Sequence, residues 1–337
     1  MKQKEEVLGV KIVGGLREAS TPWAGASLLI EVFRRSGVDS VANRILPAKG
    51  SAKGLKQGQT VESFVLLGAL GGDCLEDMQR LRDDTGLSGI LGYRPPAPET
   101  ARQWLDRFHD ETLMVAPIQG SFIPPEFRPL AGLKELRKRT VWAYIEAVRP
   151  SCEVTLDVDV QLTETTEVPY VPTWHCERKD SHPYRYVGVR LRHQQGELFR
   201  DGSSVRHFAV VTNKWDIDGR ELLEWQRGKA GTIEQVHHIL ANELAAGVFP
   251  SAKHGANAAW LRLQVITHNL LQLLKKVALP EEYANAHPKR LRFSVFTVMG
   301  RVICHAGQVL LRIADSILKT LIGPGRARIL RVIWNTS

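Results

Sequence analysis

Apolar positions recur every three to four residues through much of the N-terminal half of the chain, which predicts a helical region over residues 22–150. The first helix is expected to begin at Thr21 and Pro22, because threonine is a common N-cap and proline fits the first helical position. It is expected to end at Gly37, since glycine often follows a helix C-terminus. Further helices are predicted over residues 60–70, 73–82 and 99–108.

A proline-rich turn, R-P-P-A-P, separates the last two of these predicted helices. A short helix, a turn and a second helix that carries arginines suit a helix-turn-helix reader of DNA. Arg102 and Arg107 lie along the second helix and are the candidate DNA contacts. Ordinary helix packing produces the same pattern, so a purely structural interpretation stands beside this hypothesis.

Residues 153–215 change to the alternation of apolar and polar positions that is typical of strands. In the segment C-E-V-T-L-D-V-D-V-Q-L, apolar residues fall on one face, while Asp157 and Asp159 fall on the other. Two later segments, Y-R-Y-V-G-V-R-L-R and H-F-A-V-V-T-N, also have the composition of strands. Turn residues at Gly196 and Asp201 lie between them, so we expect a hairpin.

Helical spacing returns with predicted helices over residues 219–228, 232–246 and 256–279. From residue 285 onward, nine lysines and arginines stand against one acidic residue and hold nearly all of the net charge of +9. Apolar residues such as those at 309–313 interleave with these charges, which predicts amphipathic helices. Such a segment favours a polyanion such as DNA, while a solubilising tail or a membrane-surface helix is the alternative.

The composition argues against several classes of protein. The apolar runs are far shorter than the roughly 20 residues that a membrane helix needs, and the N-terminus, with Glu5, Glu6 and no small-residue cleavage motif, does not resemble a signal peptide. We therefore expect a cytoplasmic protein without membrane spans. The four cysteines are scattered, so neither disulfides nor a zinc site is expected.

Asp157, Asp159 and Glu234 form a constellation with a chemical interpretation. Carboxylates from a strand and a helix can converge on two Mg²⁺ ions, which activate a water or a 3′-hydroxyl and stabilise the leaving oxygen of a phosphodiester. By residue type alone, a solvated strand face and an exposed helical glutamate are the simpler explanation.

The sequence around Glu234 changes that balance, because several motifs follow one another in a fixed order. A strand ending in V-V-T-N leads through an aromatic-and-arginine helix to G-T-I-E, then to N-E-L-A-A-G-V-F-P and A-N-A-A-W. This run, over residues 196–280, resembles the C-terminal half of the DDE transposases of a large group of bacterial insertion sequences. The segments L-L-G-A-L-G-G-D-C-L-E-D-M-Q-R-L-R and P-K-R-L-R-F also resemble that group, so the resemblance covers residues 23–312.

The resemblance implies an RNase H-like fold and Mg²⁺-dependent cleavage at element ends, followed by transfer of the free 3′-hydroxyl into target DNA. Glu234, in G-T-I-E, takes the place of the third catalytic carboxylate. Asp159, rather than Asp157, matches the first, although Gln161 stands where the family usually has threonine or serine. Asp159 and Glu234 would then be metal ligands.

Candidate DNA contacts follow from the same resemblance and from the basic C-terminal region. Trp225 stands where the group often has tyrosine, and Arg227 or Lys229 would take the role of a phosphate-gripping arginine, with a spacing that is off by one or more residues. Where many members have a lysine after the glutamate, this chain has Ala241. The P-K-R-L-R-F segment adds Lys289, Arg290 and Arg292.

The second catalytic aspartate of the family has no counterpart in this chain. The family places further strands, a helix and a strand with that aspartate before the hairpin, whereas here the segment after Asp159 already resembles the one just before the hairpin. This predicts an in-frame deletion near residues 161–166, of about the size of a small domain, on the order of a hundred residues. Asp201 and Asp216, both in loop-like segments, are the nearest substitutes.

Together these patterns predict an α+β, mostly helical protein. The expected regions are an N-terminal extension over 1–21, a helical DNA-binding region over 22–150, a truncated RNase H-like domain over 151–280 and a basic helical region over 281–337.

The expected function is that of a transposase that binds terminal inverted repeats and target DNA but has lost cleavage. One alternative is an active transposase with an unusual second carboxylate. The other is a non-catalytic DNA-binding or dimerising inhibitor, a homodimer for which the apolar helix over 256–279 is the candidate surface.

Overall fold

The computed structural model describes residues 19–47, 54–113, 128–148, 185–192, 205–212, 216–227, 232–306, 308–332 and 334. The chain divides into two compact units. The larger unit comprises residues 1–153 and 236–337, and the smaller comprises residues 154–235. Helices account for most of the described residues, and antiparallel strands for a minority, so the predicted α+β, mostly helical class is confirmed at this level.

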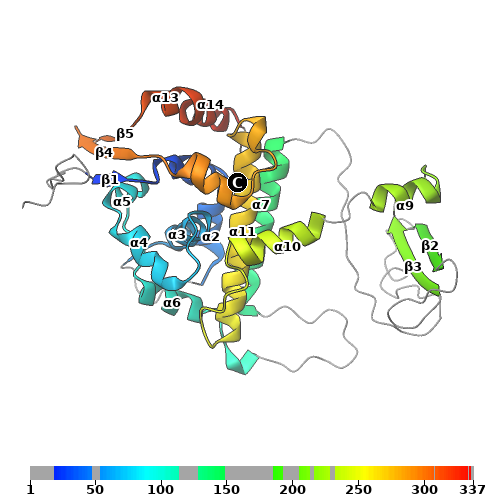
Figure 1. The fold of residues 1–337 in the computed structure, drawn as a ribbon. Coiled ribbons are helices and arrows are strands. Elements are labelled where there is room, and N and C mark those ends of the chain that lie inside the picture. Colours follow the sequence, from blue (N-terminus) through cyan, green and yellow to red (C-terminus); the bar gives the residue numbers. More distant parts are fainter. Residues whose placement is uncertain are drawn as a thin grey trace, which may run out of the picture. The chain divides into compact units, whose positions relative to one another are not determined.

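The described residues in the N-terminal part of the larger unit are mainly helical (Figure 1). The α-helices are α1 (Ser27–Arg35), α2 (Val38–Ile45), α3 (Gln57–Ala69), α4 (Met78–Asp83), α5 (Thr85–Leu91), α6 (Pro98–Asp106) and α7 (Ala131–Val148). Single 3-10 turns are η1 (Ala24–Ala26), η2 (Leu75–Asp77), η3 (Glu111–Leu113) and η4 (Arg128–Leu130). Helix α3 is buried along its whole length because apolar residues surround most of its circumference.

The predicted helices over 60–70, 73–82 and 99–108 are confirmed by α3, α4 and α6, with ends that differ by a few residues. Three helices of this region, α2, α5 and α7, were not predicted individually. Gly37, with φ of 74°, makes the left-handed turn that ends α1 and leads directly into α2. Only Ser36 and Gly37 therefore separate two helices where the pattern suggested the end of one.

The start of the first helix differs from the prediction. Thr21 is the last residue of strand β1 (Ala19–Thr21), and α1 begins only at Ser27. The Thr21 hydroxyl donates to the Asp84 carboxylate over 2.6 Å, and that carboxylate caps α5 by accepting from the Leu87 amide over 2.7 Å. Thr21 therefore ties a strand to another helix and does not cap its own.

Helix α11 (His254–Val277) forms the centre of the larger unit and packs against α1, α3, α6 and α7 (Figure 1). Its Trp260 is fully buried, and the indole Nε1 donates to the Ala245 carbonyl over 2.8 Å. Phe64 of α3 meets the edge of the Trp260 ring at 6.2 Å between centroids and lies 5.3 Å from the ring of Trp104 on α6. These aromatic contacts join three helices that are distant in sequence, and they confirm the predicted apolar helix over 256–279.

The basic C-terminal region contains strands as well as helices, which corrects the prediction of helices alone. Residues 309–313, predicted as part of an amphipathic helix, lie in β5 (Gln308–Ile313), which pairs antiparallel with β4 (Gly300–His305). The physical reason is pairing with β4, which holds the segment extended and suits its β-branched residues, Val309 and Ile313. Strand β4 also pairs with β1, giving a sheet of order β1-β4-β5.

Helical elements flank this sheet on either side in sequence. They are η5 (Glu281–Tyr283), α12 (Pro288–Leu291) and the π-turn η6 (Arg292–Phe296) before it, and α13 (Asp315–Ile317), the π-turn η7 (Leu318–Ile322) and α14 (Gly323–Arg331) after it. The helical prediction for the basic region is therefore correct for these parts only.

The smaller unit contains the predicted hairpin strands. β2 (Arg185–Arg192) pairs antiparallel with β3 (Val205–Thr212) over eight residues of each, from Arg185 opposite Thr212 to Arg192 opposite Val205. Helix α9 (Gly219–Arg227) follows, as predicted. Helix α10 (Thr232–Glu243) begins in the smaller unit and ends in the larger one, and it matches the predicted helix over 232–246.

Candidate functional site

The glutamate nominated by the sequence lies at the start of α10. Glu234 is in the first turn of that helix and is exposed, whereas Ile239 on the same helix is buried. A carboxylate in the first turn is stabilised by the helix dipole. Glu234 is thus an ionisable, solvent-accessible group at the end of a helix that is fixed further along its length.

The described residues do not place the other predicted carboxylates beside Glu234. Asp157, Asp159 and Asp201 lie outside the described residues, and Asp216 is exposed in the segment before α9. A two-metal site needs several carboxylates. The described residues provide one of the predicted set, Glu234, so they do not by themselves fit a pair of Mg²⁺ ions.

The C-terminal end of α10 is held by its last residue, Glu243. One carboxylate oxygen lies 2.7 Å from His287 Nδ1, and the other accepts from the Lys289 amide over 2.9 Å. Burial opposes the charge of Glu243, but these hydrogen bonds and the positive charge of Arg292 outweigh it, and the pKa of Glu243 is lowered. The carboxylate therefore stays ionised and joins α10 to the start of α12.

Arg292 completes this junction from the other side. Its guanidinium donates to the Ala69 and Gly68 carbonyls at the end of α3, each over 3.0 Å, and also to the Glu243 carbonyl. Desolvation lowers the pKa of Arg292, while the charge of Glu243 acts in the opposite direction. The guanidinium caps the C-termini of two helices at once, a role that the sequence analysis missed because nothing in P-K-R-L-R-F distinguishes it from its neighbours.

We refer to Glu243, His287 and Arg292 together as the α10 clasp. Its contacts give Arg292 a role inside the protein, and the DNA contact assigned to it stays a prediction. Lys289 and Arg290 are exposed, and the Arg290 guanidinium lies 5.3 Å above the ring of Tyr283. These two side chains remain the candidates for DNA contact in that segment.

The candidates on α9 are only partly described. Trp225 is about half exposed, with 49% of its surface accessible. Arg227 is the last residue of the helix, and Lys229 lies outside the described residues. Their assignment as DNA contacts stays a prediction.

The candidates on α6 occupy different environments. The Arg102 guanidinium pairs with Glu76 over 2.8 Å and lies 3.8 Å from Glu99. Arg107, the residue after the helix, is exposed, and its side chain has no hydrogen-bond or ion-pair partner among the described residues. Of the two predicted DNA contacts, Arg107 is therefore the one whose charge is not paired with a described residue.

An acidic group that could hold a cation occurs near the loop before α4. Among the described residues, the ligand atoms of Asp73, Cys74 and Asp77 lie within 4.8 Å of one another. One Asp77 oxygen already accepts from the Asp73 amide and the Cys74 thiol, over 3.1 and 3.4 Å, and the other lies 3.7 Å from Arg80. Burial acts to raise the pKa of Asp77, but the hydrogen bonds and the charge of Arg80 outweigh this effect. The pKa of Asp77 is therefore lowered.

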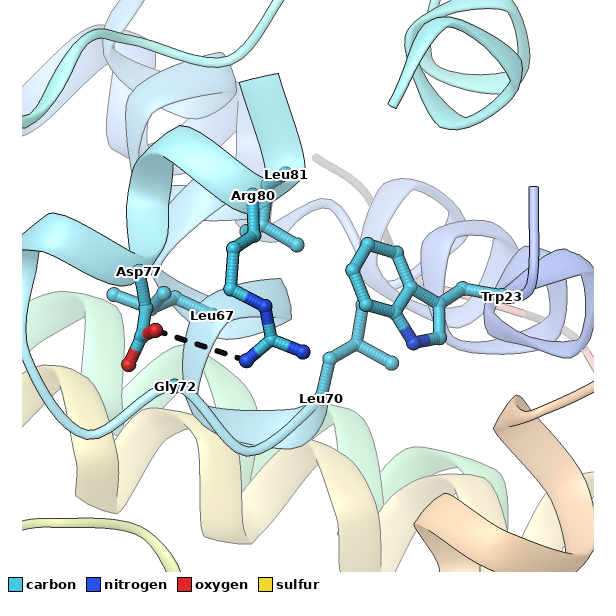
Figure 2. A pocket seen from close by; sticks show the side chains of 7 residues that line it. All are labelled: Trp23, Leu67, Leu70, Gly72, Asp77, Arg80 and Leu81. Atoms are coloured by element: carbon cyan, nitrogen blue, oxygen red, sulfur yellow. Dashed lines mark ion pairs between the residues drawn. The ribbon is translucent and has the colours of Figure 1, made fainter. Parts of the chain in front are cut away.

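Figure 2 shows that Arg80 lies between Asp77 and the ring of Trp23, 5.9 Å from the ring centroid. The hollow that these side chains line has a volume of about 10 Å³, too small for more than a water molecule. The bonds within the group give it a structural role in the turn before α4.

Comparison with protein families decides the identity of the C-terminal half. The family model described as Transposase DDE domain group 1 matches residues 181–329, a range that includes Glu234, the V-V-T-N strand and the P-K-R-L-R-F segment. This segment is a transposase DDE domain. This match supports the resemblance to insertion-sequence DDE transposases that the G-T-I-E run indicated. No curated protein and no solved structure matches the chain.

The matched family implies a general role in transposition, with DNA as the partner and a divalent metal as its usual cofactor. The matched range begins after Asp157 and Asp159. In the part of the chain that the structure describes, no helix combines the length and apolar character needed to span a bilayer.

Proposed function

We propose that this transposase binds the terminal inverted repeats of its insertion sequence and has lost DNA cleavage. The observation that carries the proposal is the DDE domain over residues 181–329 combined with the short distance to the first aspartate. Strand β2 begins at Arg185, so only residues 160–184 separate it from Asp159. That length is far below the small-domain size of roughly 100 residues expected for the strands and helix that carry the second aspartate.

Loss of one carboxylate is sufficient to remove cleavage. A pair of Mg²⁺ ions would supply charge stabilisation for phosphoryl transfer, and a full set of carboxylates held in place would be needed to bind them. Glu234 and Asp159 would supply two of the three family positions. We infer that Mg²⁺, the cofactor expected for the family, has an incomplete site in this chain.

The DNA-binding part of the proposal rests on charge. Arg107, Lys289 and Arg290 are exposed, and the C-terminal region carries a large excess of basic residues. Exposed arginines and lysines neutralise phosphates and release counterions, which supplies most non-specific DNA affinity. Recognition of specific ends requires additional contacts with base edges, for which α6 is the candidate element.

An affinity comparison tests end binding. The terminal repeat, taken from the DNA that flanks the gene, is compared with a scrambled duplex of equal length at about 0.2 M salt, where non-specific binding is weak. The proposal predicts at least about tenfold tighter binding to the repeat. The variant Glu234→Gln should bind equally well, because Glu234 belongs to the cleavage site. Equal affinity for both duplexes would remove specific end binding from the account.

An active enzyme with a substitute second carboxylate is the competing function. Asp216 is the substitute that the structure describes, and it is exposed in a segment before α9. Nicking of an intact element end in Mg²⁺, abolished by Glu234→Gln, would favour this alternative.

The dimerising inhibitor needs a surface other than α11. That helix is buried along most of its length against α1, α3, α6 and α7. Its apolar face is therefore occupied within the chain, and co-expression with an intact relative, with transposition frequency as the readout, tests whether another surface serves.

A further inference from the structure

A basic groove lies beside α6, outside the DDE domain. It has a volume of about 280 Å³ and is open to solvent. Arginines at three positions line it: Arg82 from α4, Arg94 from the loop before α6, and Arg107 from the end of α6. Among the residues that the structure describes, no aspartate or glutamate lines the groove. A concave surface with one sign of charge concentrates potential, so this groove attracts anions.

The three guanidinium groups differ in how many hydrogen-bond and ion-pair partners they have within the described part of the protein. Arg82 donates to the Pro95 carbonyl over 2.6 Å, which leaves its remaining N–H groups available. Arg94 donates through Nε to the Arg82 carbonyl over 3.1 Å and lies 3.4 Å from the Asp83 carboxylate, a weak and exposed pair. The side chain of Arg107 has no partner among the described residues. The internal bonds orient two of the arginines, and the third contributes an uncompensated charge.

We propose that this groove binds the phosphodiester backbone of DNA, with Arg82, Arg94 and Arg107 on the phosphates. The inference rests on the proposed function and specifies where the larger unit holds its DNA. Arginine forks match phosphate oxygens with two parallel hydrogen bonds. The polar residues Thr100 and Gln103 of α6 also line the groove, so a backbone held there lies next to side chains that can bond to DNA.

Arg102 does not line this groove. Its guanidinium is engaged with Glu76, and it is absent from the lining, although it is on the same helix as Thr100 and Gln103. The groove keeps Arg107 of the two α6 arginines suggested by the sequence and adds Arg82 and Arg94, while a DNA contact by Arg102 stays a prediction. Arg82 and Arg94 had no signal in the sequence, because only the fold brings them next to Arg107.

The test measures how DNA affinity of the full-length chain depends on salt. A fluorescein-labelled duplex is titrated by anisotropy at several salt concentrations with the wild type, Arg107→Ala, Arg94→Ala and the double variant. Each arginine on a phosphate should contribute about one unit to the slope of log affinity against log salt. We expect the slope to fall by about one in each single variant and by about two in the double variant.

The matched control is Arg137→Ala, which removes one exposed arginine of α7 that is not part of the groove. It should retain the wild-type slope, and the circular dichroism of all variants should match the wild type. Duplex binding by the double variant with wild-type affinity and slope would overturn the groove while leaving end binding intact. A wild type that binds no duplex would overturn the proposed function as well.

A small phosphorylated ligand is the alternative to DNA as the source of the phosphate that this groove binds. Inorganic phosphate that stabilises the wild type but not the double variant, with duplex affinity equal in both, would assign the groove to such a ligand and contradict the proposal.

Discussion

Two glutamates of the larger unit show opposite pKa shifts for clear physical reasons. Glu62 of α3 is 3% exposed and accepts two bonds from Arg34, over 2.8 and 2.9 Å, and one from the Tyr93 hydroxyl. Burial nevertheless raises the pKa of Glu62 despite the charge of Arg34, which is partly exposed. Glu243 is less deeply buried, and its pKa is lowered although its carboxylate has only two hydrogen-bond partners among the described residues, His287 and the Lys289 amide. Depth of burial, more than the presence of a partner, decides the direction.

The α10 clasp provides the first residue-level prediction. Arg292→Ala removes the donor from three helix-end carbonyls, so the free energy of unfolding should fall by about 2–4 kcal/mol. Arg292→Lys should recover only part of that loss, because an ammonium cannot reproduce the planar fork. Lys289→Ala is the control, since it removes an exposed side chain and keeps the amide that bonds to Glu243. Urea denaturation measures all three, and equal stability of Arg292→Ala and Lys289→Ala would contradict the clasp.

The second residue-level prediction concerns pH. Because the pKa of Glu243 is lowered in the folded chain, its carboxylate contributes stability that is fully present above the ordinary value of 4.5. That contribution is lost as the pH falls through the lowered pKa. Glu243→Gln should therefore be less stable than the wild type at neutral pH, with the difference shrinking in acid.

Thermal unfolding from neutral pH to below 4.5 measures this difference, with the exposed Glu282→Gln as the control. A difference between Glu243→Gln and the wild type that stays constant across the whole range would show that the charge of Glu243 is not responsible.

At the level of elements, the sequence predicted α6, α9, α10 and α11 well because each has strong helical spacing and a clear boundary. The hairpin of β2 and β3 also followed from alternation and turn residues. Strand β5 was mistaken for a helix because five residues of apolar and basic character fit both periods. Only pairing with β4, which is not encoded locally, decides between them.

Glycine at the start of α11 gives the element-level prediction. A Cβ at Gly255 would lie 2.1 Å from the Phe108 carbonyl oxygen, so α11 can approach the end of α6 only with glycine at this position. Gly255→Ala should cost about 1–3 kcal/mol of stability, because backbone cannot move aside as a side chain can. Gly247→Ala is the matched control, since a Cβ there meets no atom within 4 Å. Equal denaturation midpoints would rule out the close approach.

At the scale of the whole molecule, the sequence indicated the family but did not indicate the groups of residues that the fold brings together. The order of motifs from V-V-T-N to A-N-A-A-W indicated a DDE transposase, and the family match over residues 181–329 supports that assignment. Sequence order also nominated Glu234, and the structure places it at the exposed start of α10. By contrast, the α10 clasp and the basic groove join residues that are distant in the chain, so no local pattern could have indicated them.

The boundary between the two compact units falls within α10, after Gln235. Residues 236–280, expected within the catalytic domain, belong to the unit that also holds the N-terminal helices. The central helix α11 is thus shared between the family's C-terminal motif and the N-terminal core. The buried core residues of the larger unit all come from its own two segments, 1–153 and 236–337.

The most direct test of the central claim, binding of element ends without cleavage, is a single incubation. The wild-type chain is mixed with a duplex that carries one terminal repeat and its flanking DNA, in buffer with Mg²⁺, and both the bound fraction and the nicked fraction are measured. We predict a specific complex with no nick at the element end, identical for the wild type and Glu234→Gln. A nick at that end by the wild type, absent with Glu234→Gln, would contradict the account.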